Sequence, residues 1–399
     1  MPSRRQVNRP RVPPAGAAPL ARKARLPLVD AESAPRLREK PYLFMMAASG
    51  FWGDSMSLMM EEIFDQPRTL RRTFKAEREH AQSFKEFARQ KDFRLIVLVA
   101  RGTSDNAALF GRYLLELTTG IPVSLCAASI HTLYHARLDL RRAVVVGISQ
   151  SGEGTDINLV LKSARRQGAY TVAITNEARS TMAQLADEVF LVRAGKQRSV
   201  AATKTYTGQL LMFYLLAGGL GPHITLESVS EIPDRVEAAL ELAPSIRELV
   251  ERYRYMRQCV VVSRGLNVAN AYELALKLME TCYVVAERFS SADFAHGPVA
   301  LIERDFPVII LMPPGKVFRD LKRLVERLRK LRAETLLISS TDVRLPAATR
   351  TIRVPGPIPE IYTPIPYIVP GQLLAASLAE VKGLDPDNPR SLQIVTRTL

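Results

Sequence analysis

Short runs of apolar residues alternate with longer amphipathic segments along most of this chain. Five apolar runs predict strands, at residues 94–100, 122–127, 143–149, 170–176 and 188–194. Helical periodicity between and after them predicts helices at residues 104–119, 155–167, 181–186 and 204–218. The runs lack strict alternation of apolar and polar residues, which is typical of parallel strands buried on both faces. The pattern therefore predicts a doubly wound α/β domain.

Helical patterns flank this domain, and a second alternating pattern follows. A helix is expected at 58–91, broken near Gln66 and Pro67, and a helical linker at 224–255. The second pattern predicts strands at 258–264, 307–312, 334–340 and 351–355, with helices at 267–285, 317–331 and 365–381. Arg-Gly follows the first strand of each half, and each following helix carries an acid near its end, Glu116 or Glu280. The chain therefore reads as a duplicated α/β domain with two crevices at strand ends.

The segment AVVVGISQSGEGTD at residues 143–156 carries the strongest chemical signal. It places Ser149, Gln150 and Ser151 between a strand and a helix. Free N–H groups and the dipole of the first helical turn favour an anion at such a loop. The GxxxxGK[ST] sequence of triphosphate-binding loops is absent. Hydroxyls and backbone amides are therefore expected to bind a single phosphate on a sugar.

Composition changes this picture little. The chain has 399 residues, 47% hydrophobic and 24% charged, which is typical of a globular protein with two or three domains. Residues 1–56 hold ten Lys/Arg and four Asp/Glu and so carry +6 of the net charge of +15. The remaining +9 is scattered over the rest of the chain with no aromatic-interleaved basic stripe, so no nucleic-acid partner is expected. No run of about 18 apolar residues predicts a membrane span. Cys126, Cys259 and Cys282 lie in separate apolar segments, which indicates a reducing, cytoplasmic setting without disulfides.

Residues 1–55 are expected to form a disordered basic tail, rich in Pro, Ala and Arg. Met56 is an alternative start of the chain, just before the first helical pattern. No CxxC or HExxH pattern is present, so no metal is expected.

Four loops and one helix carry a family resemblance. They contain RGTS at 101–104, SQSGE at 149–153, ATK at 202–204, ALKLME at 275–280 and HGP at 296–298. In this order and spacing they resemble the sugar isomerase (SIS) family over residues 58–399. The likeness is strongest to the isomerase half of glucosamine-6-phosphate synthase and to SIS-type glucosamine-6-phosphate deaminases.

The resemblance implies two tandem flavodoxin-like SIS domains, each an α/β/α sandwich with a parallel sheet. The expected order is a lead-in at 56–90, the first SIS domain at 91–222, a linker at 223–256, the second SIS domain at 257–385 and an active-site tail at 386–399.

The resemblance also implies the substrate contacts. Residues expected to hold the sugar or its 6-phosphate are Gly102, Thr103, Ser104, Ser149, Gln150, Ser151, Ala201 and Lys277. Gly154 stands where the synthase has threonine, so Thr155 is expected to supply the last phosphate contact. Helix capping is the structural alternative for these hydroxyls, and it is compatible with binding.

Two residues are implied in catalysis. Glu280 is expected to move a proton between C1 and C2 of the open-chain sugar. A surface ion pair with Lys277 is the structural alternative. His296 is expected to open the sugar ring, reaching the site of a neighbouring subunit in a homodimer. A loop histidine without a chemical role is its alternative.

Two departures from the family pattern shape the functional hypothesis. No amidotransferase domain precedes the SIS pair, so the full synthase reaction is not expected. Ile394 stands where the family tail has a lysine, and an apolar side chain forms no imine. We therefore expect a cofactor-free deaminase/isomerase that converts glucosamine 6-phosphate to fructose 6-phosphate and ammonia. A phosphosugar-binding sensor with weak catalysis, and a deglycase or isomerase of another phosphosugar, remain as alternatives.

Overall fold

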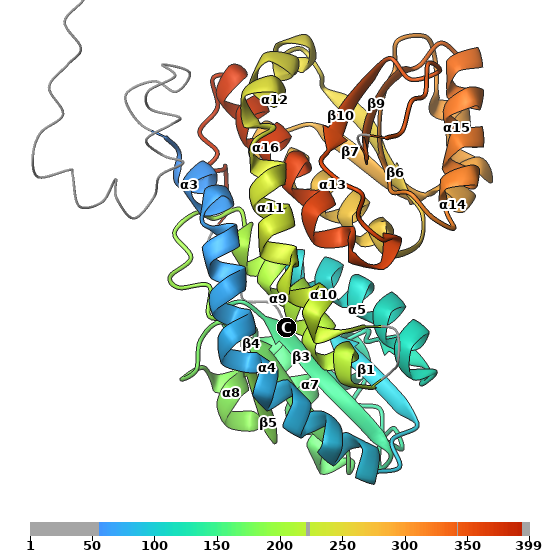
Figure 1. Ribbon diagram of the computed structural model, residues 1–399. Coiled ribbons are helices and arrows are strands. Elements are labelled where there is room, and N and C mark those ends of the chain that lie inside the picture. The colour runs from blue at the N-terminus through green and yellow to red at the C-terminus, as the bar shows by residue number, and fades with distance from the viewer. Residues whose placement is uncertain (1–55, 221–223, 341, 393–399) are drawn as a thin grey trace, which may run out of the picture. The chain divides into compact units, whose positions relative to one another are not determined.

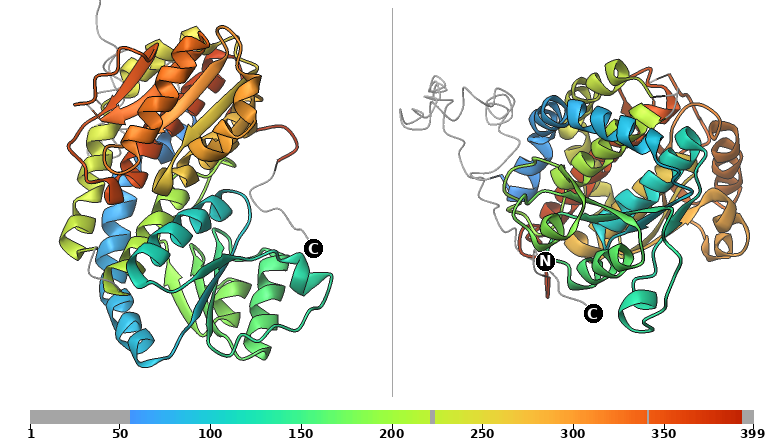
Figure 2. Two further views of the ribbon diagram at one scale, coloured as in Figure 1. Left: turned by 90° about the vertical axis from the view of Figure 1, so that its right-hand side faces the viewer. Right: turned by 90° about the horizontal axis from the view of Figure 1, so that it is seen from below.

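The computed structural model of the protein describes residues 56–220, 224–340 and 342–392. The expected tail of residues 1–55, and Ile394, lie outside these ranges. The described chain contains two five-stranded parallel sheets with helices on both sides (Figures 1 and 2). The predicted α/β class with two parallel sheets is therefore confirmed.

The first sheet has the strand order β2-β1-β3-β4-β5. Its strands are β1 (Leu95–Val99), β2 (Val123–Leu125), β3 (Ala143–Ser149), β4 (Tyr170–Thr175) and β5 (Glu188–Leu191). Its helices are α5 (Thr103–Thr119), α6 (Ser129–Thr132), α7 (Thr155–Arg166), α8 (Thr181–Leu185) and α9 (Lys204–Leu220). Helices α7 and α8 cover one face, and α5 covers the other with α9 packed against it. The chain reverses its direction of strand addition between β1 and β3, which is where such sheets bind ligands.

The second sheet repeats this arrangement in the order β10-β9-β8-β6-β7. Its strands are β6 (Gln258–Ser263), β7 (Val285–Ser290), β8 (Pro307–Met312), β9 (Glu334–Ser340) and β10 (Arg350–Val354). Its helices are η2 (Gly265–Asn267), α13 (Val268–Cys282), α14 (Ser291–Ala295), η3 (Pro298–Leu301), α15 (Phe318–Lys330), η4 (Glu360–Tyr362) and α16 (Pro364–Val381). Counted from β6, the strand order equals that of the first sheet, as expected for a duplicated domain.

Further helices precede the first half or join the two halves. They are α3 (Leu58–Phe64), α4 (Gln66–Gln90), α10 (Leu226–Ser230), α11 (Ile232–Leu240), α12 (Ala243–Val250) and η1 (Glu251–Tyr253). The predicted break near Gln66 and Pro67 is present, with Pro67 in the first turn of α4, where a missing N–H is tolerated. Helix α4 packs against α9, and both α11 and α12 pack against α16.

The helix after β6 ends earlier than the sequence predicts. The helix expected at 267–285 ends at Cys282, because Tyr283 adopts the left-handed conformation (φ 52°). The chain then forms β7, an edge strand that the sequence pattern did not predict. Val285, Glu287 and Arg288 of this strand are exposed, so it lacks the apolar run that marks the interior strands.

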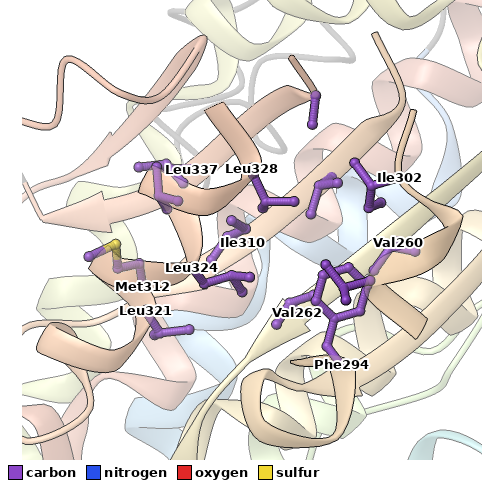
Figure 3. Close-up of a cluster of buried hydrophobic side chains, with 14 residues drawn as sticks. Val260, Val262, Phe294, Ile302, Ile310, Met312, Leu321, Leu324, Leu328 and Leu337 are labelled. Atoms are coloured by element: carbon purple, nitrogen blue, oxygen red, sulfur yellow. The ribbon is translucent and has the colours of Figure 1, made fainter. Parts of the chain in front are cut away.

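Burial on both sheet faces explains the continuous apolar runs. Val97 and Val99 of β1 join a core with Leu161 of α7, while Ile96 and Leu98 are buried on the opposite face. In the second half, alternate residues of β6 and β8 meet α14 and α15 (Figure 3). This cluster includes Val260, Val262, Ile310, Met312, Phe294, Leu321, Leu324 and Leu328.

Helix α13 of the second half packs against α5 of the first (Figure 1). This contact brings polar residues of α13 to the carboxyl end of the first sheet.

Candidate active site

A pocket of about 350 Å³ lies at the carboxyl ends of β1 and β3. Its walls come from the β1–α5 loop, the β3–α7 loop, the loop before α9, helix α13 and the C-terminal segment. The lining residues are Arg101, Gly102, Thr103, Ser104, Ile148, Ser149, Gln150, Ser151, Gly154, Asp156, Ile157, Gln197, Val200, Ala202, Thr205, Gln209, Lys277, Glu280 and Leu392. The structure therefore brings the predicted RGTS and SQS loops together on one pocket.

The β3–α7 loop is held in a tight, defined conformation. Gly152 has a φ of +66°, and a Cβ there would overlap the Ser180 side chain. The hydroxyl of Ser149 accepts a hydrogen bond from Gly152 N (3.1 Å), and that of Ser151 accepts one from Glu153 N (3.3 Å). A hydroxyl that accepts from the backbone can still donate its own proton to a ligand oxygen. The loop thus presents serine hydroxyls beside the first turn of α7.

The β1–α5 loop places a second polar edge opposite. Gly102 adopts a φ of +55° immediately before α5, a conformation that favours glycine. Ser104 is buried, and its Oγ accepts a hydrogen bond from Gln209 Nε2 of α9 at 2.9 Å. The Oγ1 atom of Thr103 instead faces the charged residues of α13.

Helix α13 contributes a lysine between two carboxylates. Lys277 is buried, and its Nζ lies 2.5 Å from Glu280 Oε2, 3.5 Å from Glu273 Oε1 and 3.1 Å from Thr103 Oγ1. The ion pair with Glu280 expected from the spacing exists, but it lines a pocket and is not a helix-surface pair. Glu280 keeps 23% of its side chain exposed, which leaves its carboxylate accessible from the pocket.

The sequence analysis did not identify Glu273. Its carboxylate is fully buried and accepts hydrogen bonds from Asn106 Nδ2 (2.8 Å) and Thr103 Oγ1 (3.1 Å). Its place four residues before Lys277 was the available signal, because residues at i and i+4 share one helix face. Glu273 therefore belongs to the charged cluster behind the pocket wall.

Burial sets the charges of this cluster. Burial raises the pKa of Glu273 to about 7, although Lys277 and the hydrogen bond from Asn106 act to lower it. Burial alone would lower the pKa of Lys277, but the carboxylates of Glu273 and Glu280 outweigh it and raise that pKa. Lys277 therefore stays protonated at neutral pH, while Glu273 gains or loses a proton in the same range.

The loop before α9 is tied to α3. Lys204 of the ATK sequence is buried, with its Nζ 3.4 Å from Glu62 Oε1 and 3.6 Å from Asp65 Oδ2. Gln197, which lines the pocket, donates to Glu62 Oε2 at 2.6 Å. Ala201 is buried, and its neighbours Val200 and Ala202 line the pocket in its place.

Two further predicted residues lie off the pocket lining. Thr155 is the first residue of α7, while Gly154 and Asp156 on either side line the pocket. His296 is exposed at the end of α14 and does not line the pocket of its own chain. The described part of the expected tail does reach the site, because Leu392 forms part of the wall.

Within the described ranges, no three His, Cys, Asp or Glu side chains are placed to hold a metal ion. None of the helices described is long and apolar enough to cross a bilayer.

Sequence comparison identifies the fold family. The SIS domain family matches residues 91–218 and 253–369. The glutamine–fructose-6-phosphate aminotransferase (isomerizing) of Pyrococcus horikoshii is 36% identical over 342 residues. The aligned region covers 84% of this chain and 56% of that relative, so the chain spans little more than half of its length.

Solved structures support the same family assignment. The C-terminal domain of glucosamine-fructose-6-phosphate aminotransferase from Francisella tularensis has a TM-score of 0.77 and 25% identity, covering 84% of this chain and 99% of that one. A putative phosphosugar isomerase from Silicibacter pomeroyi has a TM-score of 0.76 and 29% identity, covering 83% and 100%. The chain belongs to the SIS domain family and carries two SIS domains in tandem.

Proposed function

We propose that this chain is an amino-sugar phosphate deaminase/isomerase. The reaction converts glucosamine 6-phosphate and water to fructose 6-phosphate and ammonia. The observation that carries the proposal is the pocket itself, where the Glu280 carboxylate and Lys277 face loops of serine and threonine hydroxyls. The similarity to a putative phosphosugar isomerase and to aminotransferase isomerase domains supports a phosphorylated sugar as the ligand.

The phosphate binds at the β3–α7 loop in this proposal. Ser149, Gln150 and Ser151 donate hydrogen bonds, and the N-terminus of α7 adds its dipole. The open-chain sugar then extends from this loop towards α13, which places C1 and C2 beside Glu280. Thr103 and Ser104 bind the sugar hydroxyls on the way.

Glu280 then transfers the proton. Its carboxylate takes the proton from C2 and returns it to C1, which converts the amino aldose to a ketose imine. Water adds to the C2 imine, and the carbon–nitrogen bond breaks to release ammonia and leave the ketone. Lys277 stabilises the ionised form of Glu280 before the first proton transfer and after the second. His296, supplied by a second copy of the chain, opens the sugar ring.

Product analysis tests this proposal. Purified chain is incubated with glucosamine 6-phosphate, and both ammonia and fructose 6-phosphate are measured. We expect equal amounts of the two products. Glu280→Gln should lower turnover by about 10²- to 10⁴-fold, because the amide cannot accept the proton, and should leave phosphosugar binding nearly intact. Glu86→Gln, at an exposed position of α4, is the matched control.

Other outcomes point elsewhere. Interconversion of another phosphosugar without ammonia would indicate an isomerase or deglycase. Robust turnover that survives Glu280→Gln would contradict the assignment of the proton carrier.

A phosphosugar-binding sensor is the second candidate function. Ile394 favours it, because the family resemblance expects a lysine there. A sensor binds the phosphosugar tightly and forms no product. If Ile394 marks a lost activity, Ile394→Lys should raise a weak rate. If the reaction needs no imine with the protein, the same change should alter the rate little.

A further inference from the structure

The phosphate end of the pocket lacks a side-chain hydroxyl at one position. Gly154 stands where the resembling loop of the synthase has threonine, and it lines the pocket with backbone alone. The neighbouring hydroxyl of Thr155 was the expected substitute. Thr155 begins α7 and is not among the residues that line the pocket. A side chain from a neighbouring element has room to supply a phosphate contact at this wall.

Arg101 lies at this wall. It follows β1 directly and lines the pocket with half of its side chain exposed. Its Nε lies 2.7 Å from Oδ2 of Asp156, a buried carboxylate in the first turn of α7, two residues after Gly154. The charge of Asp156 thus holds the guanidinium beside the helix N-terminus, which the phosphate approaches in the proposed binding mode. A guanidinium has five N–H donors, so pairing through Nε leaves donors for a second anion.

The charges along the pocket point to the same residue. Arg101 and Lys277 are the two cations among the described lining residues. Lys277 is buried between the carboxylates of Glu273 and Glu280, which already balance its charge. Arg101 pairs with the carboxylate of Asp156, also interacts electrostatically with Asp105, and keeps half of its side chain exposed. A phosphate monoester with two negative charges therefore finds its accessible counter-charge at Arg101.

We propose that Arg101 binds the phosphate group of the substrate, in the place left by the missing hydroxyl at position 154. This proposal rests on the phosphosugar function proposed above and adds a residue to it. The resulting contact is a charge-assisted hydrogen bond between guanidinium and phosphate oxygens, with Asp156 as the positioning residue. It makes recognition of the phosphate depend on a cation as well as on hydroxyls and amides.

Calorimetric titration with fructose 6-phosphate, and separately with inorganic phosphate, tests the proposal. Arg101→Gln should weaken the affinity for both by about 10- to 100-fold and reduce its dependence on salt concentration. Arg101→Lys keeps the positive charge but lacks the planar guanidinium with its several N–H donors, and should show an intermediate loss of affinity. Arg112→Gln is the matched control, because Arg112 lies on the exposed face of α5 with its Nε 3.7 Å from Glu116. The Arg112→Gln variant should bind both probes with the affinity of the parent.

A double variant separates phosphate binding by Arg101 from neutralisation of the Asp156 charge. If Arg101 serves only to neutralise Asp156, the double variant Arg101→Gln with Asp156→Asn should regain the parental affinity, and the proposal fails. If Arg101 contacts the phosphate, the double variant stays weak. If Arg101→Gln does not fold, the affinities of Arg101→Lys and Arg112→Gln are compared instead. A parent that binds neither probe contradicts the proposed function itself, whereas parental affinity in Arg101→Gln overturns this inference alone.

Discussion

Glu273 shows how one buried carboxyl group makes the stability of the folded chain depend on pH. Its pKa is about 7 in the folded chain, against an ordinary value of 4.5. Between these values the folded chain keeps a proton that the unfolded chain has released. The contribution of Glu273 to stability is therefore fully present below pH 4.5 and falls as the pH rises to about 7.

Glu273→Gln should remove this dependence. We expect the free energy of unfolding of the variant, relative to the parent, to rise by up to about 1.4 kcal/mol per pH unit between pH 5 and 7 and then to level off. Glu280 still balances Lys277 in the variant. Urea unfolding at a series of pH values measures the difference. The exposed Glu86→Gln is again the control, and parallel stability curves for the Glu273 variant and the parent would contradict the prediction.

At the scale of elements, the β3–α7 loop depends on one glycine. Gly152→Ala places a Cβ against Ser180 at a φ of +66°. We expect a loss of about 2–4 kcal/mol of stability, together with weaker phosphosugar binding, because the serine hydroxyls move with the loop.

Gly120 at the end of α5 provides the comparison for Gly152. It has a similar φ of +69° but open space around the position of a Cβ. Gly120→Ala should therefore cost about 1 kcal/mol and leave binding unchanged. Thermal unfolding and titration of both variants check the pair, and equal losses would show that the overlap with Ser180 has no effect.

The elements also show what could be predicted from the sequence. Strands β3, β8 and β9 lie where the apolar runs predicted them, since interior strands need apolar residues on both faces. The meeting of the RGTS and SQS loops at one pocket followed from the same pattern, because the carboxyl ends of parallel strands share one edge of a sheet. The sequence pattern did not predict strand β7, because this strand carries the exposed charged residues Glu287 and Arg288 in place of an apolar run. Glu273 escaped because its partners Thr103 and Asn106 lie 170 and 167 residues away, and no local pattern records such a meeting.

At the scale of the whole molecule, the two halves share a topology but differ at their crevices. The equivalent position in the second half lies between the loops after β6 and β8, and there Glu360 Oε2 accepts a hydrogen bond from the backbone N–H of Lys316. Gly315 leaves room for this carboxylate, because a Cβ there would overlap Glu360. An anionic side chain of the protein thus lies where the first half has its pocket.

We therefore expect one phosphosugar per chain. Titration with fructose 6-phosphate should saturate at one equivalent, and Arg101→Gln should weaken that single site. Two equivalents per chain would show that the equivalent position in the second half also accepts a ligand despite Glu360.

Assembly decides whether the proposed site is complete. His296 is exposed and does not line the pocket of its own chain, and Leu301 nearby is an apolar side chain with 55% exposure. We expect a homodimer in which His296 of each chain serves the pocket of the other.

Glu280→Gln and His296→Asn should then be inactive alone. Mixed and refolded together, they should regain about a quarter of the parental sites, because half of the dimers are mixed and each of those has one intact site. Sedimentation at micromolar concentration measures the assembly. A fully active monomer, or a mixture that stays as inactive as its components, would place the ring-opening group elsewhere on the chain.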